Sequence, residues 1–275
     1  MYHPVVAIEV GARRSMELLT PLVDAAATLV SGLSDDDWHE PSNCPPWDVA
    51  KLCAHMTRNG ESLLARVQAI LVDDDAPPPD RPALDAREVD LIAAGREAMA
   101  SNLTATAAIF RSIVNACSPA QLELVSRDRS GRSMLSGRTL AWFATQRLSE
   151  VAFHSWDVRR SLGADEPLEG SPASYLLAFM FPAGAPLVGR GQDVSGTFRL
   201  VCRDSGEVYR VSFGPSGGIV EADPYAPAEV SVEADAGWLA LAAYGRASLL
   251  PPEFSVTGPR DAAERFAAAF GSPPN

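Results

Sequence analysis

Glu150 and His154 stand out because their side chains could bind one divalent ion together. They lie four residues apart in the segment RLSEVAFHSWDV, so on a helix they would share one face, about 5–6 Å apart at Cβ. His55, in the segment KLCAHM, is a candidate third ligand. Two imidazoles and one carboxylate from facing helices would leave coordination positions open for a substrate or water. The spacing alone also allows Glu150 and His154 to be an ordinary pair on a helix surface.

Four long helices would position these residues. Apolar residues recur at three and four through residues 4–162, which is the helical period. The breaks, rich in Asp, Ser, Gly and Pro, delimit predicted helices over 4–31, 48–71, 85–117 and 138–162. Asp48 is expected to cap the second helix, which would place His55 two turns inside it. Four helices connected in this way predict an antiparallel bundle.

After Leu162 and Gly163 the pattern changes to short runs with a period of two, which is typical of strands. The expected strands cover 196–203, 208–213, 219–222, 229–233 and 254–257, and two helical stretches, 237–245 and 259–270, are interleaved with them. The expected fold class is therefore α+β. We expect a helical domain at residues 1–165 and a small domain, with a sheet covered by helices, at residues 166–275.

The composition restricts the classes of partner. The chain has 275 residues, 47% of them hydrophobic, and a net charge of −12. This charge opposes binding to nucleic acid or to an anionic membrane. The four cysteines form no CxxC motif, which favours reduced thiols over a disulfide framework. The first twenty residues are charged and no apolar run approaches the ~18 residues of a membrane span, so we expect a cytoplasmic protein.

Other motifs carry less chemistry. The chain has no GxSxG elbow and no Walker A motif, so hydrolase and nucleotide-binding functions lack support. The basic stretch Arg127–Arg132 could receive a substrate carboxylate, although a solvated loop is favoured. Asp157 could orient a ligand histidine or could be a surface carboxylate. Cys53, two residues before His55, would point to the other side of the helix and is expected in the core.

Three segments resemble one known family. PSNCPPWDVAKLCAHM is similar to the CPxW(D/S/T)VxxLxxH signature of the mycothiol-dependent maleylpyruvate isomerase family, and SEVAFHSWDV resembles that family's ExxxHxWD signature. The segment WLALAAYGRASLLPPEFSVTGPRDAAERFAAAF resembles the end of the family's sterol-carrier-like second domain. The chain departs from the first signature at Pro46, where the family commonly has glycine, and at Cys53, where an aliphatic residue is usual.

The resemblance implies a DinB-like four-helix bundle followed by a sterol-carrier-like domain. It implies that His55, Glu150 and His154 bind a divalent metal, with zinc placed ahead of other ions, and that mycothiol is a cofactor or co-substrate. Arg246, in the GR element, matches the position of an arginine that the isomerase needs for activity. Mycothiol belongs to high-GC actinobacteria, and 22 of the 23 basic residues of this chain are arginine, a bias that suggests a GC-rich genome.

These inferences predict a metal-dependent, mycothiol-using enzyme. A bound cation favours the thiolate form of a thiol whose free pKa is about 8.5, and that thiolate would attack a small electrophile, such as one that bears a carboxylate. We place S-transfer ahead of the alternative, mycothiol-dependent cis–trans isomerisation of maleylpyruvate. A second alternative is a non-enzymatic protein that binds a lipid or another small molecule.

Overall fold

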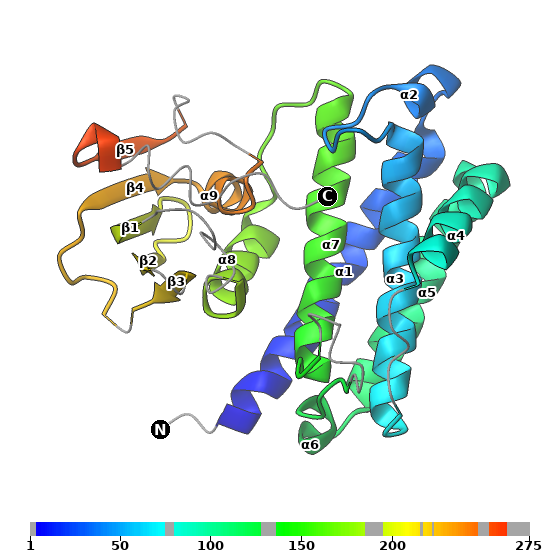
Figure 1. The fold of residues 1–275 in the computed structure, drawn as a ribbon, viewed down its shortest axis with the longest axis horizontal. Helices are drawn as coiled ribbons and strands as arrows, with labels where there is room; N and C mark the ends of the chain where they lie inside the picture. Colours follow the sequence, from blue (N-terminus) through cyan, green and yellow to red (C-terminus); the bar gives the residue numbers. More distant parts are fainter. Residues whose placement is uncertain are drawn as a thin grey trace. The chain divides into compact units, whose positions relative to one another are not determined.

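The computed structural model describes residues 4–74, 80–127, 136–184, 195–214, 217–221, 223–246 and 253–262. They belong to two compact units, Met1–Asp165 and Glu166–Asn275, which we describe one at a time (Figure 1). The fold class is α+β, with a helical N-terminal unit and a small mixed sheet in the C-terminal unit. Among the described residues, none of the helices has the length and apolar character needed to cross a membrane.

The N-terminal unit is a bundle of long helices with short helices at its ends. Its elements are α1 (Pro4–Gly32), α2 (Asp35–His39), α3 (Val49–Leu71), α4 (Arg81–Ala94), α5 (Arg96–Ala116), α6 (Pro119–Leu122) and α7 (Leu140–Ser161). Helix α1 packs against α5 and α7, and α3 packs against α4, α5 and α7 (Figure 1). Three of the four predicted helices, those that became α1, α3 and α7, are confirmed to within two residues at each end.

The prediction of one helix over 85–117 is wrong, and so is the prediction of a fully antiparallel bundle. Gly95 has φ +86° and separates α4 from α5, a backbone conformation that glycine adopts without steric cost. Helix α4 carries the chain back, so α5 begins near α2, where Arg96 pairs with Asp35 at 2.6 Å. Helices α1 and α7 therefore run in one direction, and α3 and α5 run in the other (Figure 1).

Side-chain caps fix the starts of α3 and α7. The Asp48 carboxylate accepts a hydrogen bond from the Lys51 amide at 2.7 Å, as the sequence predicts, and the Thr139 hydroxyl accepts one from the Trp142 amide at 3.1 Å. Such caps satisfy amide groups that the helix itself leaves without partners. Cys53 is fully buried in the bundle core, which confirms its predicted place. Both helices are thus anchored at their first turn and packed against each other.

The C-terminal unit contains a five-stranded sheet with the order β3-β2-β1-β4-β5. The central pair, β1 and β4, is parallel and the other neighbours are antiparallel. The elements are α8 (Gly170–Gly184), β1 (Gly196–Cys202), β2 (Val208–Gly214), β3 (Gly217–Val220), β4 (Val230–Ala234), α9 (Ala236–Ala243) and β5 (Ser255–Thr257). The five predicted strands are confirmed to within two residues at each end.

Helix α9 lies against β1 and β4, and α8 lies against α9. Gly237 permits a close approach here, because a Cβ at this position would lie 2.2 Å from the Leu168 carbonyl oxygen. Helix α8 was not predicted from the sequence, because its segment GSPASYLLAFMFPAG is apolar without a clear 3.6-residue period. Most of the predicted helix over 259–270 lies outside the described residues, which end at 262.

Candidate metal centre

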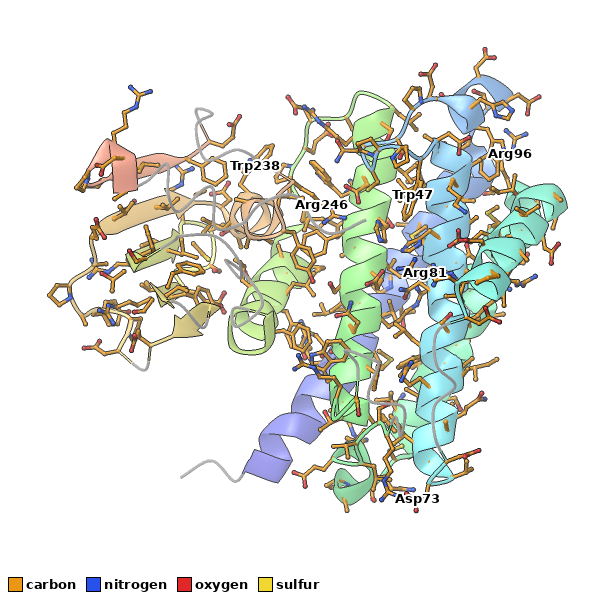
Figure 2. The ribbon with its side chains drawn as sticks, viewed as in Figure 1. Trp47, Asp73, Arg81, Arg96, Trp238 and Arg246 are labelled. Atoms are coloured by element: carbon orange, nitrogen blue, oxygen red, sulfur yellow. The ribbon has the colours of Figure 1, made fainter. Side chains whose placement is uncertain are left out.

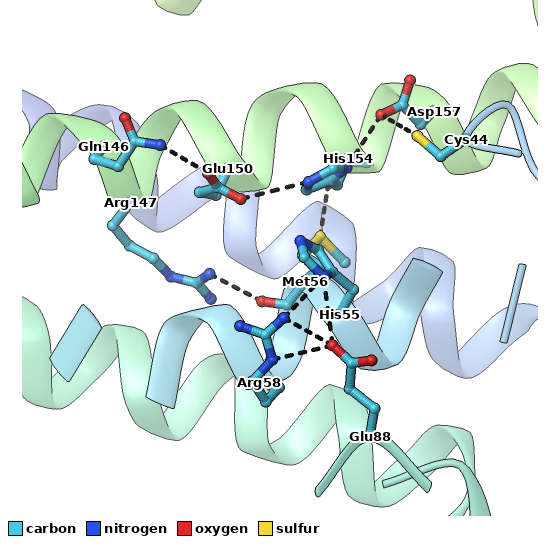
Figure 3. Close-up of polar contacts among 11 residues, drawn as sticks. Cys44, His55, Met56, Arg58, Glu88, Gln146, Arg147, Glu150, His154 and Asp157 are labelled. Carbon is cyan, nitrogen blue, oxygen red and sulfur yellow. Dashed lines mark hydrogen bonds and ion pairs between the residues drawn. The ribbon is translucent and has the colours of Figure 1, made fainter. Parts of the chain in front are cut away.

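His55 on α3 and Glu150 and His154 on α7 come together where these two helices pack (Figure 3). One potential ligand atom from each of the three side chains lies within 4.8 Å of the other two. The His154 Nε2 and Glu150 Oε2 atoms are 3.4 Å apart. The rings of His55 and His154 meet edge to face, with centroids 5.1 Å apart. The structure therefore brings together all three residues that the sequence singled out as ligands.

The donor set fits a divalent cation such as zinc. Ligand atoms about 2.1 Å from a tetrahedral zinc ion are separated from one another by about 3.4 Å, the spacing found between Glu150 and His154. The side chains of His55, Glu150 and His154 are 18%, 17% and 13% exposed, so they are shielded but can be reached from solvent. Three protein ligands leave a coordination position for a further group, as catalytic sites require.

Asp157 lies behind His154 and is completely buried. Its Oδ2 atom is 3.1 Å from His154 Nδ1. The Asn43 side-chain amide donates to Asp157 Oδ1 at 3.0 Å, and the Cys44 thiol donates to Oδ2 at 3.3 Å. A carboxylate that accepts from Nδ1 leaves Nε2 as the coordinating nitrogen. Of the two roles that the sequence left open for Asp157, the structure supports orientation of the histidine.

Cys44, His154 and Asp157 form a second group whose potential ligand atoms lie within 4.8 Å of one another. This group uses the opposite nitrogen of the same imidazole. Its carboxylate already accepts hydrogen bonds from the Asn43 amide and the Cys44 thiol and is buried. The group that contains His55 and Glu150 is the better candidate, because its atoms are partly exposed and face one another across two helices.

Glu88, on α4, lies behind His55 and is 2% exposed. Its Oε1 atom is 3.4 Å from His55 Nδ1. The Arg58 guanidinium donates to the same oxygen from Nε at 3.0 Å and from Nη2 at 2.8 Å, and Lys51 Nζ lies 2.5 Å from Oε2. On its other side, the His55 ring lies 4.7 Å from Trp47, centroid to centroid (Trp47 is labelled in Figure 2).

The surroundings shift the pKa values of the acidic and basic groups. Burial alone would raise the pKa of Glu150, but its contacts with His154, His55 and Gln146 lower it to about 2. Burial lowers the pKa of His55, and the contact with Glu88 only partly opposes this. Burial acts in the same direction on His154, but its contacts with Asp157 and Glu150 raise its pKa well above the ordinary value.

A buried arginine lies one turn before Glu150 on α7. Arg147 is 1% exposed, and its Nη1 donates to the Met56 carbonyl oxygen on α3 at 3.0 Å (Figure 3). Burial lowers the pKa of Arg147 to about 10, and the Glu150 carboxylate opposes this shift. Gly60 makes room for the guanidinium, because a Cβ there would lie 2.6 Å from Arg147 Nη2. This cation helps to balance the charge of Glu150.

Arg246 belongs to the C-terminal unit and follows α9 (Figure 2). Its guanidinium lies over the Tyr244 ring, 5.6 Å from the centroid. Arg127, the first residue of the basic stretch Arg127–Arg132, pairs with Asp73 at 2.6 Å in an exposed ion pair. Residues 128–132 lie outside the described part of the chain. Within the N-terminal unit, the site is built from α3, α4, α7 and the segment before α3.

Glu88 and the two cations that pair with it, Lys51 and Arg58, were not among the site residues predicted from the sequence. Lys51, His55 and Arg58 are spaced four and three residues apart on α3, so they share one helix face. A basic stripe beside a ligand histidine was a signal for a buried carboxylate on a neighbouring helix. Nothing local singled out Glu88 itself, which lies in the charged segment DAREVD.

Comparisons with known proteins agree with this architecture. Two solved structures, mycothiol-dependent maleylpyruvate isomerase and a histidine-to-alanine mutant of it, each match with a TM-score of 0.62 at 15% identity. Each match covers 90% of this chain and 92% of the other chain, and at this identity it shows a shared fold. No curated protein sequence matches the chain.

The family comparison gives a more direct result. A family model described as the mycothiol maleylpyruvate isomerase N-terminal domain matches residues 19–159, which is 141 of the 275 residues. The matched range includes His55, Glu150 and His154. Because the match covers more than half of the chain, the protein belongs to the mycothiol-dependent maleylpyruvate isomerase family.

Proposed function

We propose that this protein is a metal-dependent enzyme that uses mycothiol to isomerise the cis double bond of a small dicarboxylate of the maleylpyruvate class. The observation that carries the proposal is the cluster of His55, Glu150 and His154 inside a domain of this family. The comparisons support isomerisation better than the S-transfer that the sequence analysis placed first. Zinc remains the proposed ion because two imidazoles and a carboxylate suit it.

Each proposed ligand has a partner that fixes its orientation. Asp157 holds His154 Nδ1 and Glu88 faces His55 Nδ1, while the Gln146 amide donates to Glu150 Oε1 at 2.7 Å. A metal bound here would supply positive charge that favours the thiolate of mycothiol at neutral pH. The partial burial of all three ligands strengthens the electrostatic interactions at the sulfur.

The reaction itself needs no net oxidation or reduction. When bound, mycothiol would supply a nucleophilic sulfur that adds reversibly to one carbon of the conjugated double bond. The π electrons of the double bond would move onto the adjacent carbonyl, the resulting carbon–carbon single bond could rotate, and return of those electrons would release the thiolate and leave the trans isomer. Arg246 is the proposed partner for a substrate carboxylate, because its planar guanidinium can bind a carboxylate through two hydrogen bonds.

Metal content is the first test. Elemental analysis of the purified protein should find about one equivalent of zinc or another divalent ion, and the His154→Ala variant should have lost it. Wild-type protein without metal, even after zinc is added, would contradict the proposal and favour the non-enzymatic binding protein.

Turnover with a limiting amount of mycothiol is the second test. Maleylpyruvate should be converted to its trans isomer over many cycles per mycothiol molecule, whereas an S-transferase would consume one thiol for each substrate. The Arg246→Ala variant should keep its metal and lose turnover. Equal turnover in the presence and absence of mycothiol would overturn the proposal.

A further inference from the structure

We propose that Glu88 is a positioning residue that selects the tautomer of His55 able to bind a metal. The proposal rests on the function proposed above, because it assigns His55 as a ligand. It concerns two groups, one acidic and one basic, that compete for the same ring nitrogen. Both come from the N-terminal unit, Glu88 from α4 and Arg58 from α3 (Figure 3).

The Nδ1 atom of His55 has both competitors within reach. Arg58 Nη2 lies 2.9 Å away, and Glu88 Oε1 lies 3.4 Å away. A guanidinium has only donors and a carboxylate has only acceptors. The neutral ring can therefore satisfy one of them at a time: Nδ1 accepts from Arg58, or Nδ1–H donates to Glu88.

The two choices have opposite consequences for metal binding. If Nδ1 accepts from Arg58, the proton of the neutral ring is on Nε2, which then has no lone pair for a metal. If Nδ1–H donates to Glu88, Nε2 is free to coordinate. Arg58 thus favours the tautomer that cannot bind a metal through Nε2, and Glu88 favours the tautomer that can.

The contacts of Glu88 favour the second arrangement. Two nitrogens of Arg58 donate to Glu88 Oε1, at 3.0 and 2.8 Å, and one of them, Nη2, is the nitrogen that lies near Nδ1, so the carboxylate competes with the ring for this donor. Lys51 holds the other carboxylate oxygen at 2.5 Å. Glu88 and Arg58 are 2% and 8% exposed, so little water competes for these contacts. Glu88 acts in two ways: it is an acceptor for the ring Nδ1–H, and it competes with Nδ1 for the Arg58 Nη2 donor, which lies near both.

The tautomer can be measured without any metal. The protein has four histidines, so ring ¹⁵N shifts of labelled, chelator-treated protein at neutral pH can be assigned with a His55→Gln variant. Wild type should have the proton of His55 on Nδ1. In Glu88→Gln the acceptor is weaker and Arg58 is released, so the proton should move to Nε2. Retention of the Nδ1–H tautomer in folded Glu88→Gln would overturn the proposal.

A second variant tests the competition itself. In Arg58→Met the competing donor is gone, so the Nδ1–H tautomer should persist. In the double variant Glu88→Gln, Arg58→Met, the Nδ1–H fraction should recover part of what Glu88→Gln alone loses. The double variant also serves if Glu88→Gln does not fold, because it leaves no unpaired guanidinium at this site. A double variant with the proton on Nε2 would contradict the competition.

Zinc affinity, measured by competition with a chromophoric chelator, should follow the tautomer. Loss of a carboxylate behind a ligand histidine typically weakens metal binding about 10- to 100-fold, and we expect a loss in this range for Glu88→Gln. Glu61→Gln is the matched control, because Glu61 pairs with Arg87 across the same two helices, at 2.5 Å. Its affinity should equal that of wild type, and an equal loss in both variants would refute a specific role for Glu88.

The outcomes separate this inference from the proposed function. The tautomer measurement uses neither metal nor mycothiol, so it tests Glu88 even if the protein has no isomerase activity. Conversely, turnover by wild type and Glu61→Gln tests the function with Glu88 intact.

Discussion

The two candidate ligand histidines each lie in front of a buried carboxylate, but the two carboxylates are held by different chemistry. Asp157, on the same helix as His154, accepts from the Asn43 amide and the Cys44 thiol. Glu88, on a different helix from His55, is held by the cations Lys51 and Arg58. One carboxylate is thus fixed by hydrogen bonds from neutral groups and the other by ion pairs.

This difference sets the basicity of the two rings. The pKa of His154 is raised because Asp157 and Glu150 together outweigh the effect of burial. The pKa of His55 is lowered by burial and by the positive charges of His154 and Arg58, and the contact with Glu88 only partly opposes this. A carboxylate that accepts a hydrogen bond from a ligand imidazole makes the imidazole a better electron-pair donor to a metal, so His154 should be the stronger metal ligand. His55 should be the ligand whose orientation depends on a neighbouring helix, α4.

Removal of either histidine ring should have the largest effect on metal binding. Zinc sites with four protein ligands bind with about 10–16 kcal/mol, so loss of one ligand costs about 2.5–4 kcal/mol, or roughly 100- to 1000-fold in affinity. We expect His154→Ala and His55→Ala both to lose zinc to this extent, measured by chelator competition. Loss in His154→Ala alone would instead favour the group of Cys44, His154 and Asp157.

The pH dependence of folding stability tests the ion pairs of Glu88. Burial alone would raise the pKa of Glu88, but contacts with His55, Lys51 and Arg58 lower it to about 2. A lowered folded-state pKa gives stability that is present above the unfolded value, about 4.3, and is lost as the pH falls towards 2. Lowering this pKa from about 4.3 to about 2 corresponds to on the order of 3 kcal/mol of folding stability.

Urea unfolding of the metal-free protein between pH 7 and pH 2 measures this contribution. Wild type should be more stable than Glu88→Gln at pH 7, and the difference in the free energy of unfolding should shrink as the pH falls from about 4.5 to 2. The control, Glu61→Gln, should show a smaller change, because the Glu61 side chain is 25% exposed and water screens its ion pair. A constant difference over this range would contradict the assignment.

The same contrast explains what the sequence could predict. The pairs within one helix, Glu150 with His154 and His154 with Asp157, follow from residue spacing alone, and the segment before α3 is recognisable from its prolines and its cap. Glu88 could not be found in this way, because its contact with His55 depends on how α4 packs against α3. That packing depends on the break at Gly95, which the sequence analysis read as the interior of one helix.

Asp157→Asn tests the carboxylate that contacts His154. An asparagine retains the shape but carries no charge, so His154 becomes a weaker donor and its Nδ1–H loses a charged acceptor. We expect zinc affinity to fall about 10- to 100-fold. Addition of the Arg58→Met change should not restore it, because Arg58 competes only at His55. Recovery of affinity in that double variant would show that the two sides are not independent.

Cys44→Ala should have the smallest effect. It removes the thiol donor to Asp157 Oδ2 but leaves the Asn43 donor in place. Loss of one hydrogen bond costs about 1 kcal/mol or less for a weak donor such as a thiol, so zinc affinity should fall no more than about fivefold. Cys44→Ser, which keeps a donor, should recover most of this loss.

A cobalt-substituted protein then decides whether Cys44 is a donor to Asp157 or a ligand. If Cys44 only supports Asp157, the near-ultraviolet spectrum of the resting cobalt protein should lack a thiolate-to-cobalt charge-transfer band, and Cys44→Ala should leave the visible bands nearly unchanged. A band that disappears in Cys44→Ala would move the metal to the group of Cys44, His154 and Asp157. In that case Asp157 would be a metal ligand and not, like Glu88, a carboxylate that orients a ligand histidine.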